Sequence, residues 1–250
     1  EQFNNPLINE IKPRHRWYLR WWAWLLWLFL VTSAGVTVYL FSQTIYYLGD
    51  IKEQVVNNTN SLAVVAKPIT VDNLALRKTL EITSAPSWGN LQAKVVVVEF
   101  GDFQCPYCAQ AFPVWRQMMA KYQDQVKFIW RDFPVAELHP QAVLAAQAGR
   151  CAHEQNKFWQ FYDKVFINQA NLSKEALKEY ARQVNLDVVK FNDCLDSGKY
   201  LAAVQADLTE GAKLGIKGTP TFFFNGQLAE GVPPVETFEG IIINLLEKNK

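Results

Sequence analysis

The uncharged, apolar run from Trp21 to Gly49 limits what this chain can form more than any other feature of its sequence. A helix of about 20 apolar residues crosses a hydrocarbon core of about 30 Å, and residues 21–43 meet that requirement. Lysines and arginines precede the run, and Asp50 is the first charge after it. Because basic residues mark the cytoplasmic end of membrane helices, we expect residues 1–20 to form a cytoplasmic basic tail. The bulk of the chain is then extracytoplasmic, in a single-pass protein of the cell membrane.

Two other interpretations of the same run are possible. A cleaved signal peptide would use Thr32-Ser33-Ala34 as its cleavage site, but the apolar run continues past that point to Phe41. A buried core helix would carry an apolar stripe along one face, and this run shows no such stripe. We therefore predict an uncleaved anchor over residues 21–43, followed by a juxtamembrane linker over residues 44–68. Either the anchor or the signal peptide would export the rest of the chain.

The composition narrows the possible functions of the exported part. The 25 basic and 24 acidic side chains of the chain nearly cancel, to a net charge of +1. The chain therefore lacks the excess of positive charge that binds nucleic acid. Aromatic residues make up 14% of the chain, which excludes collagen-like and fully disordered structure. We therefore expect a monomeric globular domain with no nucleic-acid partner.

From about residue 69 onward the sequence alternates strand and helix patterns, which predicts an α/β domain over residues 69–250. Its clearest strand is the β-branched run from Val95 to Phe100, typical of a strand that is buried on both faces. Ser173 and Asp187 are expected helix N-caps within a helical insertion of about residues 136–214. The other expected elements are a helix to about residue 122, a strand at 126–133, a hairpin at 221–230 with Asn225-Gly226 as its type I′ turn, and a helix at 234–248.

The chemistry is concentrated in Cys105-Pro106-Tyr107-Cys108, at the start of the helix that follows this strand. A cysteine at a helix start lies over unpaired backbone N–H groups and the positive end of the helix dipole, which stabilise a thiolate. Pro106 suits the first helical turn, where its missing N–H costs nothing. We therefore predict that Cys105 is the exposed nucleophile and that Cys108 is shielded one turn inside. Because a stabilised thiolate is a good leaving group, a disulfide between them would be given away readily.

Zinc binding and haem attachment compete with redox chemistry as functions of a CxxC motif. Zinc would need two further ligands, and the candidate donors form no second CxxC and no compact histidine pair. These donors are Cys151, His153, Cys194 and His139. Haem attachment requires a histidine directly after the second cysteine, where this chain has Ala109. We therefore expect redox chemistry with no metal and no cofactor, and a zinc-binding or substrate-holding module without turnover stays open as an alternative.

Glu99 is an acid within the valine run, where a charged side chain is costly to bury unless it has a partner or a task. It could point to a sheet edge or pair with Lys94 or Arg131. Alternatively, it could lie beneath the cysteine pair, where its carboxyl group would accept the proton of Cys108 and return it during exchange. We predict this catalytic position for Glu99.

Thr219-Pro220 precedes an aromatic strand, and its proline either begins that strand in the ordinary way or follows a cis peptide bond. Together with the cysteine motif, this segment forms a recognisable pattern. The sequences VVVVEFGDFQCPYC and GIKGTPTFFFNG resemble the DsbA-like branch of the thioredoxin-fold superfamily. The resemblance covers about residues 72–246, and it rests on the pairing of CPYC with GTPTFF.

The resemblance implies a thioredoxin fold that is split by an inserted α-helical subdomain. It also implies that Pro220 is cis and packs beside the active-site disulfide, and that the backbone of Thr219 binds the substrate chain. Pro106 and Tyr107 complete the expected substrate-binding set, with Pro-Tyr standing where the best-known members have Pro-His. Proteins of this kind oxidise thiols of newly exported proteins, and a membrane-embedded, quinone-linked thiol oxidase reoxidises them.

Cys151 and Cys194 both fall within the expected insertion. Each could be a buried free thiol, which is a common small apolar residue in protein cores, or the two could form a second redox pair. In an exported chain with no other partner for them, a mutual disulfide that joins two helices is the expected state. Some DsbA-like proteins also carry a second, non-catalytic bridge. We therefore predict a structural disulfide between Cys151 and Cys194.

Together these features predict a membrane-anchored, extracytoplasmic thiol–disulfide oxidoreductase of a bacterial envelope. In this prediction the pair Cys105–Cys108 introduces disulfides into reduced exported proteins. Disulfide isomerisation or reduction by the same site is an alternative, and the equilibrium of the pair with glutathione would separate these directions.

Overall fold

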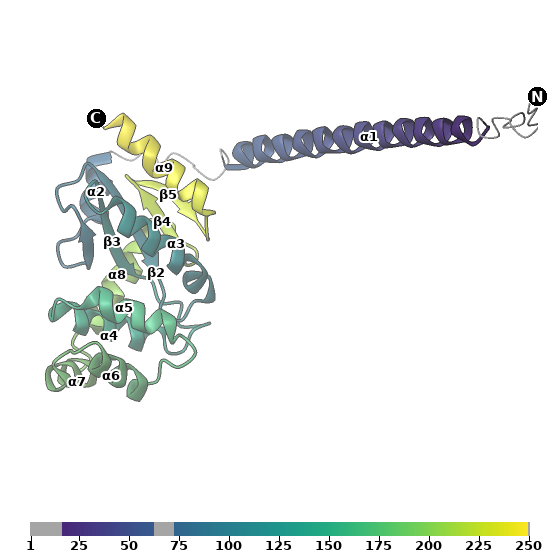
Figure 1. Cartoon of the computed structure of the whole chain (residues 1–250). Helices are drawn as coiled ribbons and strands as arrows, with labels where there is room; N and C mark the ends of the chain where they lie inside the picture. Colours follow the sequence, from purple (N-terminus) through teal and green to yellow (C-terminus); the bar gives the residue numbers. More distant parts are fainter. Residues whose placement is uncertain (1–16, 63–72, 250) are drawn as a thin grey trace, which may run out of the picture. The chain divides into compact units, whose positions relative to one another are not determined.

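The computed structural model describes residues 17–62 and 73–249 of the chain, which divides into two compact units, residues 1–63 and 64–250. The described part of the first unit is one continuous helix, α1 (Trp17–Leu62), drawn as the long purple-to-blue ribbon of Figure 1. Its segment Trp24–Tyr47 is, within the described residues, the one helix long and apolar enough to cross a membrane. The predicted linker at 44–68 is helical as far as Leu62, and its residues 63–68 lie outside the described residues, as do residues 1–16 of the predicted tail.

The hydroxyl groups of α1 are suited to an apolar surrounding. Each of five Ser and Thr side chains donates a hydrogen bond to a backbone carbonyl three or four residues earlier in the helix. They are Thr32, Ser33, Thr37, Ser42 and Thr44. A polar group left without a partner in hydrocarbon costs several kcal/mol, on the order of a lost hydrogen bond or more, and these contacts remove that cost.

The second unit is built on a five-stranded sheet with the strand order β1-β3-β2-β4-β5. The strands β2 and β3 are parallel, and the other neighbouring pairs are antiparallel. The strands are β1 (Ser87–Gly89), β2 (Val95–Gly101), β3 (Val126–Asp132), β4 (Thr221–Phe224) and β5 (Gln227–Glu230). The predicted strands at 95–100, 126–133 and 221–230 are therefore confirmed, whereas the short edge strand β1 was not predicted.

The central strand β2 is buried along its whole length, as its β-branched run predicts. Because side chains alternate along a strand, Val95 and Val97 pack into a core with α3 (Pro106–Tyr122) and α9 (Val235–Lys248). Val96 and Val98 face the opposite core, which contains side chains from α2 (Asn73–Leu80) and α8 (Leu201–Lys213). The sheet is thus covered on both faces.

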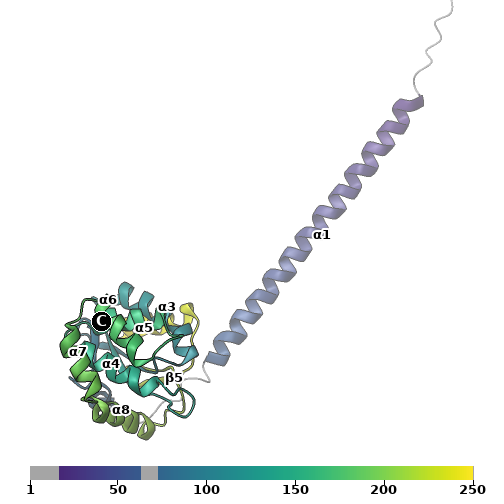
Figure 2. The same ribbon diagram turned by 90° about the horizontal axis from the view of Figure 1, so that it is seen from below.

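The helical insertion consists of four helices and leads into α8. They are α4 (Ala142–Glu154), α5 (Phe158–Ile167), α6 (Lys174–Gln183) and α7 (Val188–Asp196). Ser173 and Asp187 cap α6 and α7 with side-chain hydrogen bonds, which confirms both predicted N-caps. Helix α4 contacts α5, α6, α7 and α8 and lies at the centre of the insertion (Figure 2). In Figure 1 the helices α4 to α7 gather beyond one end of the strands.

A buried cluster of charges joins the insertion to the sheet. Arg131 and Asp132 of β3 meet Arg150 of α4 and Asp207 of α8, all nearly excluded from solvent. Arg131 binds Asp207 at 2.8 Å, and Arg150 binds both Asp132 and Asp207. Each charge therefore has an opposite partner, which is the condition under which charged groups are tolerated inside a protein.

The hairpin β4–β5 turns at Asn225 and Gly226, which have φ angles of 47° and 86°. Positive φ at both positions is the signature of the predicted type I′ turn. The turn is fastened to the start of β2, because the Val96 N–H donates to the Asn225 side chain at 2.7 Å and the Asn225 N–H donates to the Val96 carbonyl at 2.8 Å. This fixes the register of β4 along β2 and so places the segment before β4 beside the cysteine pair.

Candidate active site

The cysteine pair lies where the loop after β2 enters α3. Cys105 is the N-cap residue with an extended backbone, and Pro106 is the first residue of the helix, as predicted. The Cys105 N–H donates to the Asp102 carbonyl at 3.1 Å, and the Ala109 N–H donates to the Cys105 carbonyl at 3.1 Å. Both cysteines are free thiols in this structure.

Several hydrogen bonds stabilise the charged form of Cys105 and lower the pKa of its thiol from 9.0 to about 5. The largest contribution comes from the side chain of Cys108, and burial opposes it. Thr219 and the backbone N–H groups of Cys108 and Tyr107 lower the pKa further. The N–H contributions are those expected of a sulfur at a helix start. At neutral pH, Cys105 is therefore a thiolate.

Cys105 is not exposed, however, and that part of the sequence prediction is wrong. Only 3% of the residue is accessible to solvent, against 60% of the neighbouring Tyr107. Two segments distant in sequence lie against Cys105. The Thr219 carbonyl is 3.3 Å from its Sγ, and the Gln169 side chain donates to its carbonyl oxygen at 2.8 Å. Sequence neighbours alone do not reveal these contacts.

Cys108 is fully buried, as predicted. Its surroundings raise the pKa of its thiol, whereas those of Cys105 lower it. Burial raises the pKa of its thiol well above 9.0, and the hydrogen bond to Cys105 and the negative charge of Glu99 raise it further. The Asp102 N–H, 3.4 Å from the Cys108 Sγ, is a weaker influence that favours the thiolate. One thiol of the pair is thus held as an anion and the other as a neutral group.

Glu99 lies on β2 and is completely buried. It is on the same side of the strand as Val95 and Val97, the side covered by α3. Burial raises the pKa of its carboxyl group well above 4.5, a hydrogen bond from Tyr162 lowers it, and the charge of Cys105 raises it. The Tyr162 hydroxyl lies 3.4 Å from Oε2 of Glu99.

The alternative roles for Glu99 are wrong. Strand β2 is the centre of the sheet, so Glu99 is at no edge. Lys94 binds the Asn249 carbonyl at 3.0 Å, and Arg131 binds Asp207. The charge of Glu99 raises the pKa of Cys108, which agrees with a position near the cysteine pair, and the catalytic role of Glu99 stays a prediction.

Thr219 and Pro220 are joined by a cis peptide bond, as the sequence resemblance implies. Pro220 is buried and leads directly into β4. The Thr219 carbonyl accepts the hydrogen bond of the Cys105 thiol, which places this segment in contact with the first cysteine. The buried Thr219 hydroxyl has no partner among the described residues while Cys105 is a thiol.

Asp102 is the site residue that the sequence analysis missed. Its carboxylate is buried and accepts hydrogen bonds from the backbone N–H groups of Gln104 at 2.7 Å and Val135 at 2.9 Å. It also contacts Nδ1 of His139 at 2.7 Å. His139, named from the sequence only as a candidate zinc donor, thus ties the start of the insertion to the cysteine loop. An acid three residues before a helix-start cysteine was the available signal.

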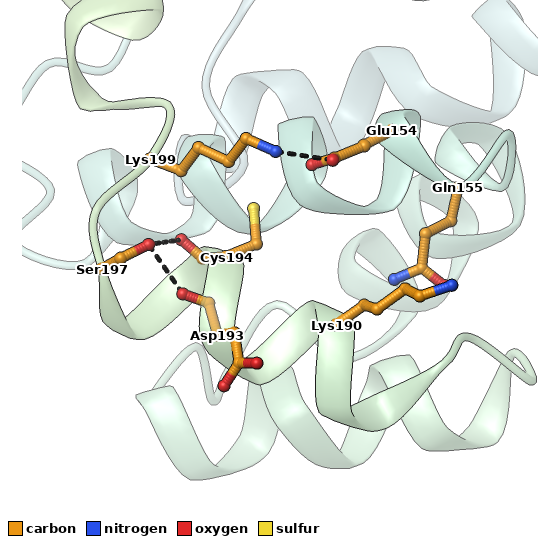
Figure 3. Close-up of a pocket in the computed structure, with 7 residues that line it drawn as sticks. All are labelled: Glu154, Gln155, Lys190, Asp193, Cys194, Ser197 and Lys199. Carbon is orange, nitrogen blue, oxygen red and sulfur yellow. Dashed lines mark hydrogen bonds and ion pairs between the residues drawn. The ribbon is translucent and has the colours of Figure 1, made fainter.

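Cys151 and Cys194 are joined by a disulfide, which confirms the predicted pairing and links α4 to α7. Beside it, Figure 3 shows a surface pocket of about 680 Å³ at the ends of these helices. Cys194 is the only predicted site residue on its wall, and the pocket belongs to the insertion rather than to the CxxC site. Its lining residues are Glu154, Gln155, Lys190, Asp193, Cys194, Ser197 and Lys199. In residues 17–62 and 73–249, no three His, Cys, Asp or Glu side chains gather in a group that could hold a metal ion.

Comparison with known proteins agrees with the fold. The model of a family described as thioredoxin matches residues 83–244. Several solved structures are similar, among them the following two. A thioredoxin-like oxidoreductase from Silicibacter pomeroyi is 25% identical, with 68% of this chain and 98% of that chain covered and a TM-score of 0.62. Oxidised BdbD from Bacillus subtilis is 26% identical, with 67% and 95% covered and a TM-score of 0.58.

The curated relatives are longer proteins. The Na(+)/H(+) antiporter NhaA 3 of Salinispora tropica is 34% identical over 156 residues, which are 62% of this chain and 24% of that protein. This chain thus spans about a quarter of the length of the curated relatives it matches. Fold and cysteine pair together define a thioredoxin-like redox protein. The chain belongs to the thioredoxin family, in its DsbA-like branch of thiol–disulfide oxidoreductases.

Proposed function

We propose that this protein introduces disulfides into reduced exported proteins, with Cys105 and Cys108 as the exchanging pair. The observation that carries the proposal is the position of Cys105 at the start of α3, where Cys108 and backbone N–H groups lower the pKa of its thiol to about 5. A thiolate of low pKa is a good leaving group, so it stabilises the reduced form of the pair and makes the oxidised form a strong oxidant. The direction of electron flow follows from this asymmetry.

In the proposed cycle a substrate thiolate attacks Sγ of Cys105 in the Cys105–Cys108 disulfide. A mixed disulfide forms, the bond to Cys108 breaks, and Cys108 leaves with the electron pair and takes a proton from Glu99. A second substrate thiolate then attacks the substrate sulfur of the mixed disulfide. The substrate is released with a new disulfide, and Cys105 is the leaving group, as a thiolate. The Cys105–Cys108 pair has then taken up two electrons and is reduced.

The substrate chain would lie along Thr219 and Pro220, with Pro106 and Tyr107 on the other side of Cys105. The Thr219 carbonyl accepts the Cys105 thiol at 3.3 Å in this structure, and it has no such donor once Cys105 is a thiolate or part of a mixed disulfide. It is then free to accept a backbone N–H of the substrate. Tyr107, which is largely exposed beside Cys105, supplies apolar surface for the same chain.

We further propose that α1 anchors the domain with residues 21–43 in the membrane, residues 1–20 in the cytoplasm and residues 69–250 outside it, as a monomer. A membrane-embedded, quinone-linked thiol oxidase would then reoxidise the pair, and confinement to one membrane raises the local concentration of both. The antiporter names belong to relatives of which this chain spans 24%, and the proposal takes nothing from them.

The proposal is tested with the full-length protein in detergent, equilibrated with mixtures of reduced and oxidised glutathione. We expect an equilibrium potential well above the roughly −270 mV of thioredoxin, and stoichiometric oxidation of a reduced peptide dithiol. The Cys105→Ser protein is the matched control and should oxidise nothing. A potential near that of thioredoxin would instead make the protein a reductase, and one bound zinc with unreactive cysteines would make it a holding module.

A further inference from the structure

Glu99 has one described hydrogen-bond partner, and that partner comes from the helical insertion rather than from the sheet. We infer that Tyr162 is a positioning residue for Glu99. Its hydroxyl holds Oε2, so that Oε1 is the oxygen that exchanges the proton with Cys108. This inference rests on the proposed function, because it assigns atoms within the proton transfer of that cycle.

The two carboxyl oxygens of Glu99 have different surroundings. Oε2 lies 3.4 Å from the Tyr162 hydroxyl, whereas Oε1 is buried with no hydrogen-bond partner among the described residues. A carboxyl oxygen that accepts a hydrogen bond is the poorer site for the proton of the neutral acid. The proton therefore resides on Oε1, and this oxygen is the one available to the sulfur of Cys108.

The position of the Tyr162 hydroxyl is set by close aromatic packing of its ring. The ring centroid lies 4.7 Å from that of Phe166, 5.1 Å from that of Trp130, and 5.7–5.8 Å from those of Phe112 and Phe103. Tyr162 lies on α5, and the rings that hold its side chain in place come from the insertion, from α3, from the loop after β2 and from β3. Burial also raises the pKa of Tyr162 well above 10.0, so the hydroxyl keeps its proton and remains a donor at working pH.

The charged and titratable groups around this acid come from two helices. From α3 the thiols of Cys105 and Cys108 interact with Glu99, and from α5 Tyr162 does so. Beyond the tyrosine, Arg116 and Asp163 form an ion pair at 2.9 Å and influence Tyr162 with opposite signs. The cysteines are required for the reaction, so Tyr162 is the member of this group that can be altered while the redox pair remains intact.

The hydrogen bond to Oε2 favours the carboxylate over the neutral acid. Its loss therefore raises the pKa of Glu99, so the group stays protonated to higher pH. A protonated Glu99 cannot take the proton of Cys108 when Cys108 attacks a mixed disulfide and closes the Cys105–Cys108 bond. Without the Tyr162 hydroxyl, ring closure should need a higher pH.

The test uses full-length protein in detergent with a preformed mixed disulfide between Cys105 and glutathione. The rate of ring closure, in which Cys108 attacks Cys105 and releases glutathione, is measured against pH. We expect Tyr162→Phe to move the midpoint of this profile upward by roughly 1 pH unit. Tyr180→Phe, which loses a hydroxyl bound to the Asn171 carbonyl at 2.9 Å inside the insertion, should leave the midpoint unchanged.

In a Glu99→Gln background, Tyr162→Phe should produce no shift, because the tyrosine acts through the acid. An unchanged midpoint in Tyr162→Phe, or an equal shift with and without Glu99, would overturn the inference. A second measurement needs no substitution at Tyr162: uniform fluorotyrosine labelling makes the hydroxyl a stronger donor and should move the midpoint down, except in Glu99→Gln. If the wild-type mixed disulfide never closes, it is the proposed function that fails.

Discussion

The two cysteine pairs of this chain differ little in burial and greatly in surroundings. All four cysteines are nearly inaccessible to solvent, Cys105 and Cys108 at 3% and 0% and Cys151 and Cys194 at 1% and 7%. Yet the first pair consists of free thiols at a helix start, and the second is a bond between two helix interiors. Burial alone therefore does not make a cysteine inert.

The difference lies in which groups reach each sulfur. The pKa of Cys105 is lowered by its partner cysteine, by Thr219 and by backbone N–H groups of the helix start. Cys151 and Cys194 are 43 residues apart in sequence and hold α4 against α7. The first arrangement stabilises a thiolate, and the second closes a long loop of the unfolded chain.

The largest contrast is expected from serine substitutions. Cys105→Ser should lower the rate of disulfide transfer to a reduced peptide by about 10³-fold or more, because it removes the sulfur that the substrate attacks. The double variant Cys151→Ser and Cys194→Ser should retain the rate of the wild type within a small factor. The measurement is the initial rate of peptide oxidation at neutral pH, and a comparable loss in both proteins would mean that the second pair is also redox-active.

Glu99→Gln should have the next largest effect, about a 10²-fold slower closure of the Cys105–Cys108 ring, because the group that takes the proton of Cys108 is lost. Rapid mixing of the reduced protein with an oxidised peptide measures this step. Glu154→Gln, on α4 beside the second pair, is the matched control and should leave the rate unchanged. Equal rates in wild type and Glu99→Gln would remove Glu99 from the mechanism.

Removing the second disulfide should act on stability. The double alanine variant at Cys151 and Cys194 should lose up to about 4 kcal/mol of unfolding free energy, since the bond closes a loop of 43 residues. Thermal and urea unfolding of the two proteins, each with Cys105 and Cys108 oxidised, measure the loss. A variant as stable as the wild type would show that packing between α4 and α7 suffices without the bond.

Asp102→Asn should have a smaller effect on stability, about 1–3 kcal/mol, because an amide cannot accept all the hydrogen bonds that the buried carboxylate now accepts. Asp187→Asn, at the exposed N-cap of α7, keeps an acceptor and should cost only a few tenths of a kcal/mol. The comparison is made by urea unfolding. Similar losses in the two variants would mean that the Asp102 contacts do not stabilise the cysteine loop.

Local features of this fold could be predicted from the sequence, because each depends on near neighbours. The valine run forms β2, Ser173 and Asp187 cap their helices, and Asn225-Gly226 makes the type I′ turn. The helix continues to Leu62 and was predicted only in part, because the Asn- and Thr-containing sequence after residue 56 indicated a partly helical linker.

The parts of the site that could not be predicted depend on contacts between distant residues. His139 meets Asp102 across 37 residues, and Tyr162 meets Glu99 across 63. Gln169, in the loop after α5, donates a hydrogen bond to the Cys105 carbonyl and helps to shield this residue from solvent. No spacing or propensity in the sequence reports these contacts, since they arise when the insertion folds back onto the sheet.

The most direct test of this account is the titration of Cys105 in the reduced full-length protein, with the Cys151–Cys194 disulfide intact. The ultraviolet absorbance of the thiolate and the pH dependence of alkylation should both give a midpoint of about 5. The Cys105→Ser protein should lack this transition. A midpoint near 9, the value of an unperturbed thiol, would contradict the claim that the helix start and its neighbours hold this sulfur as an anion.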